Sequence, residues 1–473
     1  MVKLHRLTTT LVAGLSAEIA NKIFPLVIIH YAQSRLGMER FGYAQFGIYL
    51  VDLFLPVVVW GYQMLGSIRT GEEHGAGRSP GAFAGTLITM RLIHAVFATI
   101  ALFALVYLVP EWQPYRHVVL ALSFILFTGA LDMTWLHVGT QRMAQFSLLT
   151  VAAKSASLVL ILWLVQDPDD AVLYAALSFG ANGLISLGTI VLSRRYLRGF
   201  RFSLRERSAI FRSAFPLGVG FLLIYFYDRL DLVIVETLAG MEGVGFYAGP
   251  LRLQQSLGPL VSMMGMVFFS EMVVQRDRKD WVPHVRSGLL AILAVILPVV
   301  CGIWFVDADL LALILGEDFR PGGNILAILV LTLIPHALIT VFGNQILVLQ
   351  KRMKFFNSAL AAGVAGGLGA GYILGSIYGL VGVAVAMVLV KCLVAGAITI
   401  KAVAGMGGLP LPGLGRVVLP SAIMTGALLL LPRPGTTTVI LTGALVYSLA
   451  FVLLNRELAL RILRALRQGK PQS

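Results

Sequence analysis

The chain has 473 residues, of which 58% are hydrophobic and only 13% carry a charge, and its mean hydropathy is +0.85. A soluble protein of this length needs far more polar surface, so the composition excludes a soluble enzyme or binding module. The net charge is +14. In a membrane protein such an excess collects on cytoplasmic loops, and no basic-aromatic module is present, so we expect no nucleic-acid partner.

Apolar runs of about 20 residues recur along the whole chain, and each is long enough to cross about 30 Å of hydrocarbon. We therefore predict an all-α polytopic membrane protein with about fourteen transmembrane helices. In chain order the expected spans are 8–31, 43–65, 83–109, 117–137, 144–165, 171–192, 210–238, 246–274, 284–305, 323–348, 355–374, 380–400, 417–431 and 436–454.

Positive charge is concentrated on one side of the predicted membrane. About 24 of the 37 Lys and Arg residues fall in loops on the side that holds the N-terminus, and about 5 fall in loops on the other side. The strongest block is RRYLRGFRFSLRER, residues 194–207. The positive-inside rule makes this side cytoplasmic. It predicts a multi-pass protein of the cell inner membrane with both termini in the cytoplasm.

The Arg-rich block also divides the chain. We predict an N-lobe at 1–200 with six spans, a C-lobe at 201–405 with six spans, and two more spans with a basic cytoplasmic tail at 406–473. The halves share short motifs: FGYA precedes the second span and VGFYA the eighth, while TQRM and QKRM follow the fourth and tenth. A duplicated six-helix bundle predicts two lobes related by an axis along the membrane normal, with a cavity between them.

Six cations lie deep inside predicted spans. A charge at the bilayer centre costs about 2.5–3.5 kcal/mol, so we expect them to line a polar cavity. They are Lys22, Arg91, Lys154, Arg229, Arg252 and Lys391. Carboxylates accompany them, as orienting or ion-coupling groups: Glu18, Asp52, Asp132, Asp228, Asp231 and Glu236. The alternative is that these charges pair with one another and hold helices together.

The seventh span carries the densest charge, in IYFYDRLDLVIVET at 224–237. Because this span opens the second half, we expect its charged face to line the cavity between the lobes. Its acids would keep Arg229 charged and oriented, or carry a coupling ion.

Motifs for catalysis are absent from the sequence. It contains no GxxxxGK[ST], HExxH or GxSxG and no Cys/His ligand cluster, and its two cysteines form no CxxC pair. We therefore expect no enzyme activity, no metal and no cofactor. Coupling to a proton, to sodium or to the membrane potential stays open.

Three stretches resemble a known family. LDMTWLHVGTQRMAQFSLLTVAAK, residues 131–154, resembles the span 4 to span 5 signature of Wzx-type polysaccharide flippases, with a Trp, a Gly, a polar turn and then Lys154. YDRLDLVIVETLAGMEGVGFYAGPLRL at 227–253 is similar to their span 7–8 hairpin, and GEDFRPGGNILAILVLTLIP at 316–335 to their span 10. The similarity covers most of 1–405. The order of these motifs is typical of the multidrug/oligosaccharidyl-lipid/polysaccharide (MOP) exporter superfamily.

The resemblance implies a V-shaped, two-lobe transporter that uses alternating access. Its substrate would be an undecaprenyl-diphosphate-linked oligosaccharide repeat unit, moved from the inner to the outer leaflet for lipopolysaccharide or exopolysaccharide biosynthesis. Its partners would be membrane lipids and the polysaccharide polymerase machinery. A cation-rich cavity suits a diphosphate head group.

Two alternatives remain. A MATE-like drug or cation antiporter on the same fold would favour an acid-dominated cavity, against which the deep cations argue. A membrane polymerase or glycosyltransferase acting on lipid-linked sugars usually needs a long external loop with catalytic groups, and the predicted loops have fewer than about 20 residues.

Overall fold

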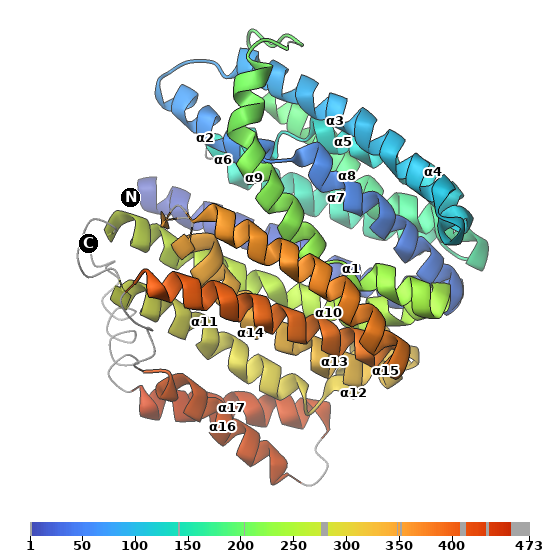
Figure 1. Ribbon diagram of the computed structural model, residues 1–473, viewed down its shortest axis with the longest axis vertical. Helices are drawn as coiled ribbons and strands as arrows, with labels where there is room; N and C mark the ends of the chain where they lie inside the picture. The colour runs from blue at the N-terminus through green and yellow to red at the C-terminus, as the bar shows by residue number, and fades with distance from the viewer. Residues whose placement is uncertain are drawn as a thin grey trace. The chain divides into compact units, whose positions relative to one another are not determined.

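The computed structural model describes residues 2–140, 142–202, 204–275, 282–347, 349–350, 352–406, 413–431 and 435–455. Side chains are described from Phe24 onward, apart from residues 143–144, 263, 266–275 and 284. Every regular element in these ranges is a helix (Figure 1). The all-α fold class predicted from the apolar runs is thus confirmed.

The elements are α1 (Val2–Val59), α2 (Tyr62–Gly75), α3 (Gly81–Leu108), η1 (Pro110–Tyr115), α4 (Arg116–Leu122), α5 (Phe124–Leu131), α6 (Thr134–Gly139), α7 (Met143–Leu164), η2 (Pro168–Asp170), α8 (Ala171–Ser193), η3 (Arg194–Tyr196), α9 (Arg207–Tyr227), α10 (Asp231–Gln275), α11 (Val282–Ile303), α12 (Asp307–Leu315), η4 (Glu317–Gly322), α13 (Gly323–Leu329), η5 (Val330–Thr332), α14 (Leu333–Leu338), η6 (Ile339–Leu347), α15 (Met353–Ala404), α16 (Gly415–Leu429) and α17 (Thr436–Leu454). The η segments are short 3₁₀ or π turns.

Within the described ranges, nine helices are long and apolar enough to cross a membrane, or ten if the bent pair 110–122 and 124–139 counts as one span. Three of the long helices contain a glycine with a non-helical backbone: Gly37 in α1, Gly240 in α10 and Gly379 in α15. The fourteen expected spans are consistent with helices divided at these glycines, and their exact number stays a prediction.

The chain packs as two compact units. The first comprises Met1–Arg252 and Leu360–Val383, and the second comprises Leu253–Ala359 and Ala384–Ser473. Residues 201–252 therefore pack with the N-terminal part of the chain, although the sequence assigns them to the C-lobe. The predicted division of the chain follows repeats of membrane spans and not compact packing. It therefore stays a prediction, with lobes at 1–200 and 201–405, a C-terminal part at 406–473 and a V shape.

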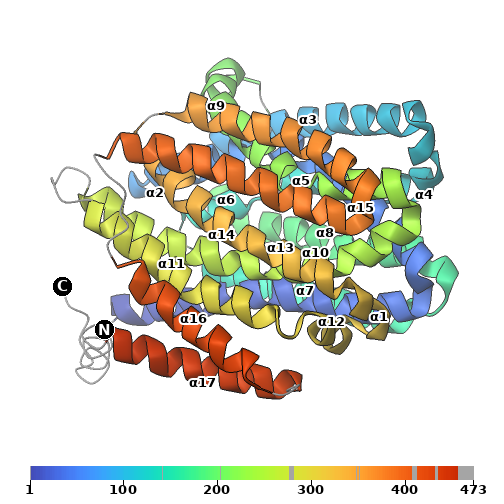
Figure 2. The ribbon, with the colours of Figure 1, turned by 60° about the horizontal axis from the view of Figure 1, so that its bottom comes forward.

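In the first unit, α1 packs against α3, α7, α8 and α9 (Figure 1). Trp135 and Tyr62 are fully buried at the centre of an apolar cluster there. In the second unit, α11 packs against α14, α16 and α17. Figure 2 shows α16 and α17 side by side, where Met424 and Val439 bury each other's apolar surface. Many outer side chains are exposed and apolar, such as Leu430 at 85%, as expected for helices surrounded by lipid.

The first unit contains two similar turns. α1 breaks at Gly37 and α10 at Gly240, with φ angles of +76° and +61° that favour glycine. Both glycines are followed by Met-Glu and then by the matching motifs FGYA and VGFYA. The repeated sequence therefore adopts a repeated backbone break.

These two turns contact each other reciprocally. A Cβ atom added to Gly42 would lie 1.8 Å from the carbonyl oxygen of Met241, and one added to Gly245 would lie 2.3 Å from the carbonyl oxygen of Met38. Only glycine allows two helix backbones to approach so closely. The matching motifs thus meet across a symmetric, backbone-to-backbone contact.

Candidate functional site

The charged stretch of the seventh span lies at a break between two helices. α9 ends at Tyr227 and α10 begins at Asp231, so Asp228 and Arg229 lie in the turn between them. The N–H of Asp228 still donates to the carbonyl of Ile224 over 3.1 Å, which closes the end of α9. In a membrane, non-helical backbone is tolerated where protein buries it or where it lines a water-filled cavity.

α1 holds this break at two points. The Asp52 carboxylate forms an ion pair with the Arg229 guanidinium, and the Tyr49 hydroxyl donates to the Arg229 carbonyl. The guanidinium also lies over the ring of Tyr225, 4.4 Å from its centroid, which adds a cation–π attraction. The side chains of Arg229 and Asp52 remain 29% and 15% exposed. The pair is therefore positioned by its neighbours but is not sealed.

Two further cations are coupled to this pair by charge, Arg252 directly and Lys154 through Arg252. Lys154 of α7 donates to the Oδ1 atom of Asn182 in α8 over 3.0 Å. Lys154 and Arg252 of α10 are both half-buried, and their charges act on each other. The charge of Arg252 also interacts with those of Arg229 and Asp52. We call Lys154, Arg229 and Arg252 the cation cluster, with Asp52 as its paired acid.

The cation cluster concentrates like charge where the dielectric constant is low. Like charges repel strongly there. A carboxylate offsets this repulsion at one end of the cluster, where Asp52 pairs with Arg229. Asp231 lies at the same break, is 4% exposed and accepts a bond from the N–H of Leu232. The cluster is thus mixed in charge, with its excess of cations toward Lys154 and Arg252. Such a site can bind a small dianion through charge-assisted hydrogen bonds.

Arg91 and Asp132 lie at another break, between α5 and α6, where they bind backbone groups. Arg91 is fully buried and donates to the carbonyls of Gly129 (2.6 Å) and Asp132 (2.8 Å). The Asp132 carboxylate accepts bonds from the N–H (3.2 Å) and hydroxyl (2.6 Å) of Thr134. Together they satisfy the backbone where α5 ends and α6 begins. Both groups are thus engaged at the α5–α6 break, and a cavity role for Arg91 and Asp132 stays a prediction.

Four other predicted residues have no established role at the cation cluster. Glu236 is 8% exposed and accepts a bond from the Tyr115 hydroxyl over 3.3 Å. Lys391 is half-buried in the second unit. The side chains of Lys22 and Glu18 lie outside the described residues. A cavity role for these four stays a prediction.

Three neighbours of the cation cluster were missed from the sequence. Tyr225 precedes Arg229 by four residues, about one helical turn. Tyr49 precedes Asp52 by three, so helical spacing places it on the face of α1 that carries Asp52. That spacing was a usable signal. Asn182 gave none, because an isolated amide in an apolar helix does not indicate which cation it will meet.

Comparison with known proteins shows the family to which the chain belongs. The chain matches the profile of the family described as polysaccharide biosynthesis protein over residues 11–273. The chain belongs to this family. It is 22% identical over 345 residues to a protein of Shigella dysenteriae named as an O-antigen transporter, covering 72% of this chain and 85% of that one. It is 22% identical over 388 residues to a protein of Escherichia coli strain K12 of the same name, covering 79% and 91%.

Solved structures share the fold. The lipid II flippase MurJ, in an inward closed conformation, superposes with a TM-score of 0.73 at 15% identity, covering 95% of this chain and 99% of that one. A multidrug resistance MATE family transporter of the MOP superfamily superposes with a TM-score of 0.66 at 15% identity, covering 85% and 97%. The resemblance noted in the sequence is thus confirmed: the chain belongs to the polysaccharide biosynthesis family, shares the fold of the MurJ and MATE transporters, and is a multi-pass membrane protein.

Proposed function

We propose that this protein is a flippase that moves an undecaprenyl-diphosphate-linked oligosaccharide repeat unit from the inner to the outer leaflet of the cytoplasmic membrane by alternating access. The cation cluster carries the proposal, because three cations whose charges act on one another, one of them at a helix break, suit a diphosphate head group. The protein would lie in the inner membrane with both termini in the cytoplasm.

In this mechanism Asp52 acts as an internal substitute for the substrate. It holds Arg229 in place while the site is empty, which lowers the cost of keeping a cation in a low-dielectric site. A diphosphate would compete with Asp52 for Arg229 and would also engage Arg252 and Lys154. The partial exposure of Arg229 leaves room for that exchange.

A MATE-like antiporter for cations is the weaker alternative. A site for cationic substrates favours acids that are not already paired, and here Asp52 is bound to Arg229. A polymerase or glycosyltransferase is also weaker, because the named relatives are transporters. We also propose that the protein interacts with the polysaccharide polymerase machinery.

The decisive test replaces single cations. Lys154→Ala and Arg252→Ala should abolish export of the polysaccharide in cells while leaving the protein in the membrane, because each removes one charge from the diphosphate site. Lys154→Arg should retain part of the activity. Arg195→Ala is the matched control, since Arg195 is an exposed arginine outside the cation cluster. Full export by both cluster Ala variants would refute the proposal.

The energy source follows from the charge of the substrate. A diphosphate carries about two negative charges, and moving one charge through 100 mV is worth about 2.3 kcal/mol. Outward movement from a negative interior is therefore downhill by about 4–5 kcal/mol, which corresponds to more than a thousandfold bias at about 1.4 kcal/mol per tenfold. The membrane potential alone would then drive transport.

Experiments in reconstituted vesicles can distinguish transport driven by the membrane potential from transport coupled to an ion. Flipping of a lipid-linked oligosaccharide should respond to an imposed potential at equal pH and equal sodium on both sides. The opposing hypothesis makes one of four acids, Glu18, Asp52, Asp228 or Asp231, a proton or sodium site. A response confined to a pH or sodium gradient at zero potential, and lost on neutralising one of these acids, would establish that hypothesis instead.

A further inference from the structure

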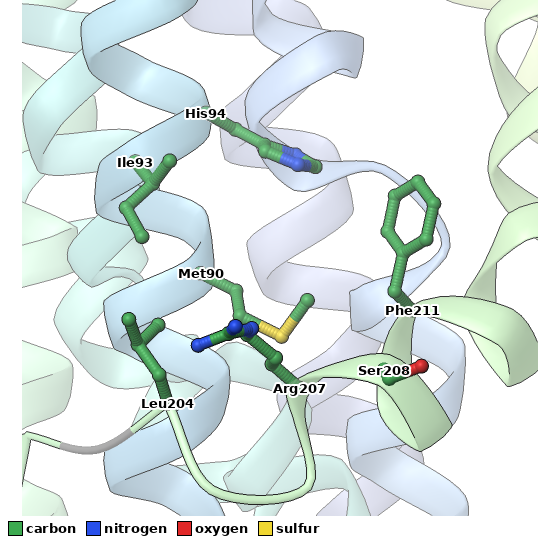
Figure 3. A pocket seen from close by; sticks show the side chains of 7 residues that line it. All are labelled: Met90, Ile93, His94, Leu204, Arg207, Ser208 and Phe211. Atoms are coloured by element: carbon green, nitrogen blue, oxygen red, sulfur yellow. The ribbon is translucent and has the colours of Figure 1, made fainter.

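A groove of about 290 Å³ lies between α3 and the start of α9, away from the cation cluster. Met90, Ile93 and His94 of α3 line one side, and Leu204, Arg207 and Phe211 line the other (Figure 3). The rings of His94 and Phe211 meet edge to face, with their centroids 6.3 Å apart, and close one end. The groove is thus mainly apolar, with a charged side chain reaching into it.

The charged group is Arg207, the first residue of α9. Figure 3 shows its guanidinium extending across the groove toward Met90. Ser208 also lines the groove, and both side chains are exposed. The acid next to them, Glu206, is taken by Arg69, with 3.2 Å between Nη2 and Oε2. The mouth of the groove is therefore positive, and the N-terminal dipole of the 21-residue helix α9 adds to that field.

An apolar track leads away from this charge. On α3, Ile93 is followed by Phe97 and Ile100, which are 64% and 60% exposed. Their spacing places all three on one face over about 10 Å of helix. On α9, Phe211 is followed one turn later by exposed Phe215. One positive end followed by an apolar channel matches the profile of a single lipid, with a charged head and an acyl chain.

We propose that this groove binds an anionic glycerophospholipid of the leaflet that faces the Arg-rich segment 194–207. Its phosphodiester would accept hydrogen bonds from Arg207, and one acyl chain would lie against Met90, Ile93 and Phe211. Basic pockets between transmembrane helices on the cytoplasmic side bind such head groups. A single lining cation suits a singly charged phosphodiester, whereas a diphosphate suits the cation cluster. A bound lipid would tie α3 to α9, the helix that leads into the break at Arg229.

The test uses the full-length protein in detergent and phosphatidylglycerol as the probe, with bound lipid counted by native mass spectrometry. Arg207→Gln should weaken phosphatidylglycerol binding about tenfold, through the loss of a charge-assisted hydrogen bond. Ile93→Trp, which fills the groove from its exposed side, should weaken it by a similar factor while keeping the charge. Arg195→Gln is the matched control in the same segment and should bind as the parent does.

Other probes identify the occupant. Phosphatidylethanolamine, which has no net charge, should bind at least tenfold more weakly than phosphatidylglycerol. Inorganic phosphate should not displace the lipid, because it cannot use the apolar track. The proposal is overturned if Arg207→Gln behaves like Arg195→Gln, if inorganic phosphate displaces the lipid, or if undecaprenyl phosphate binds this groove more tightly than phosphatidylglycerol.

Discussion

The reciprocal glycine contact allows a sharp prediction about conformation. Changing Gly42 to Ala would place a methyl group 1.8 Å from the carbonyl oxygen of Met241 and 2.8 Å from the amide nitrogen of Gly245. Neither neighbour is a flexible side chain, so the two backbones would have to separate by more than an ångström. The substitution should therefore disfavour the packed arrangement of α1 and α10 described here.

The size of the effect follows from the cost of overpacking. Forcing an extra methyl group into a tight contact costs about 1–3 kcal/mol. At about 1.4 kcal/mol per tenfold, the packed state loses roughly 5- to 150-fold in population relative to a state with the contact open. Gly245→Ala should act in the same direction, because its new methyl group would lie 2.3 Å from the carbonyl oxygen of Met38. The two effects should not add, because they act on one contact.

Chemical cross-linking of cysteines measures that population. Cysteines at Met38 and Met241, in a protein whose two native cysteines are replaced by serine, should be joined in membranes by a short bifunctional maleimide. Gly42→Ala should slow this cross-linking at least fivefold. Gly180→Ala is the control, because a methyl group there meets nothing within 4 Å. Unchanged cross-linking in Gly42→Ala would show that the two turns do not pack as described.

Three further substitutions test the helix breaks. Arg91→Met should lower the free energy of unfolding by about 3 kcal/mol, because two buried carbonyls lose charged donors; an unchanged thermal midpoint in detergent would contradict the capping role. Asp52→Asn should raise the affinity for undecaprenyl diphosphate, since Arg229 loses its competing acid; a titration that shows weaker binding would refute the exchange mechanism. Tyr49→Phe removes the hydroxyl bond to the Arg229 carbonyl, worth about 0.5–1.5 kcal/mol, and should speed hydrogen exchange at 228–231; an unchanged rate would show that this bond does not hold the turn.

The helices were predictable because hydrocarbon leaves the backbone little choice. Without water, a spanning segment must satisfy its own N–H and C=O groups, so the length of each apolar run predicts a helix. The equivalence of the two turns was also visible, since the matching motifs FGYA and VGFYA stand at equivalent places in the two halves, although the glycine breaks themselves were not predicted. Their mutual contact was not visible, because nothing in either motif indicates which backbone the other approaches.

The pairing of charges could not be predicted from the sequence. The ion pair between Asp52 and Arg229 joins residues 177 positions apart, and only tertiary packing brings them together. The break at 228–230 contains neither proline nor glycine, so no conventional breaker marks it. The cost of a charge in hydrocarbon says that Arg91 and Arg229 must avoid lipid. It does not say whether a carboxylate, a backbone carbonyl or a substrate will receive them.

Arg91 and Arg229 differ in the group that receives their charge. Both lie at a break between helices in the first unit, and both contribute a guanidinium to it. At the α5–α6 break, Arg91 is fully buried and gives its hydrogen bonds to carbonyls, so the break is closed and no ligand can reach the charge without unfolding it. At the α9–α10 break, Arg229 is bound to an acid and remains 29% exposed, and the charge of Arg252 acts on it. Leaving a charged, unwound turn open to solvent inside a membrane bundle costs stability that a closed break would retain. The open break is therefore where the chain's function should be sought, and the closed break is where its architecture is fixed.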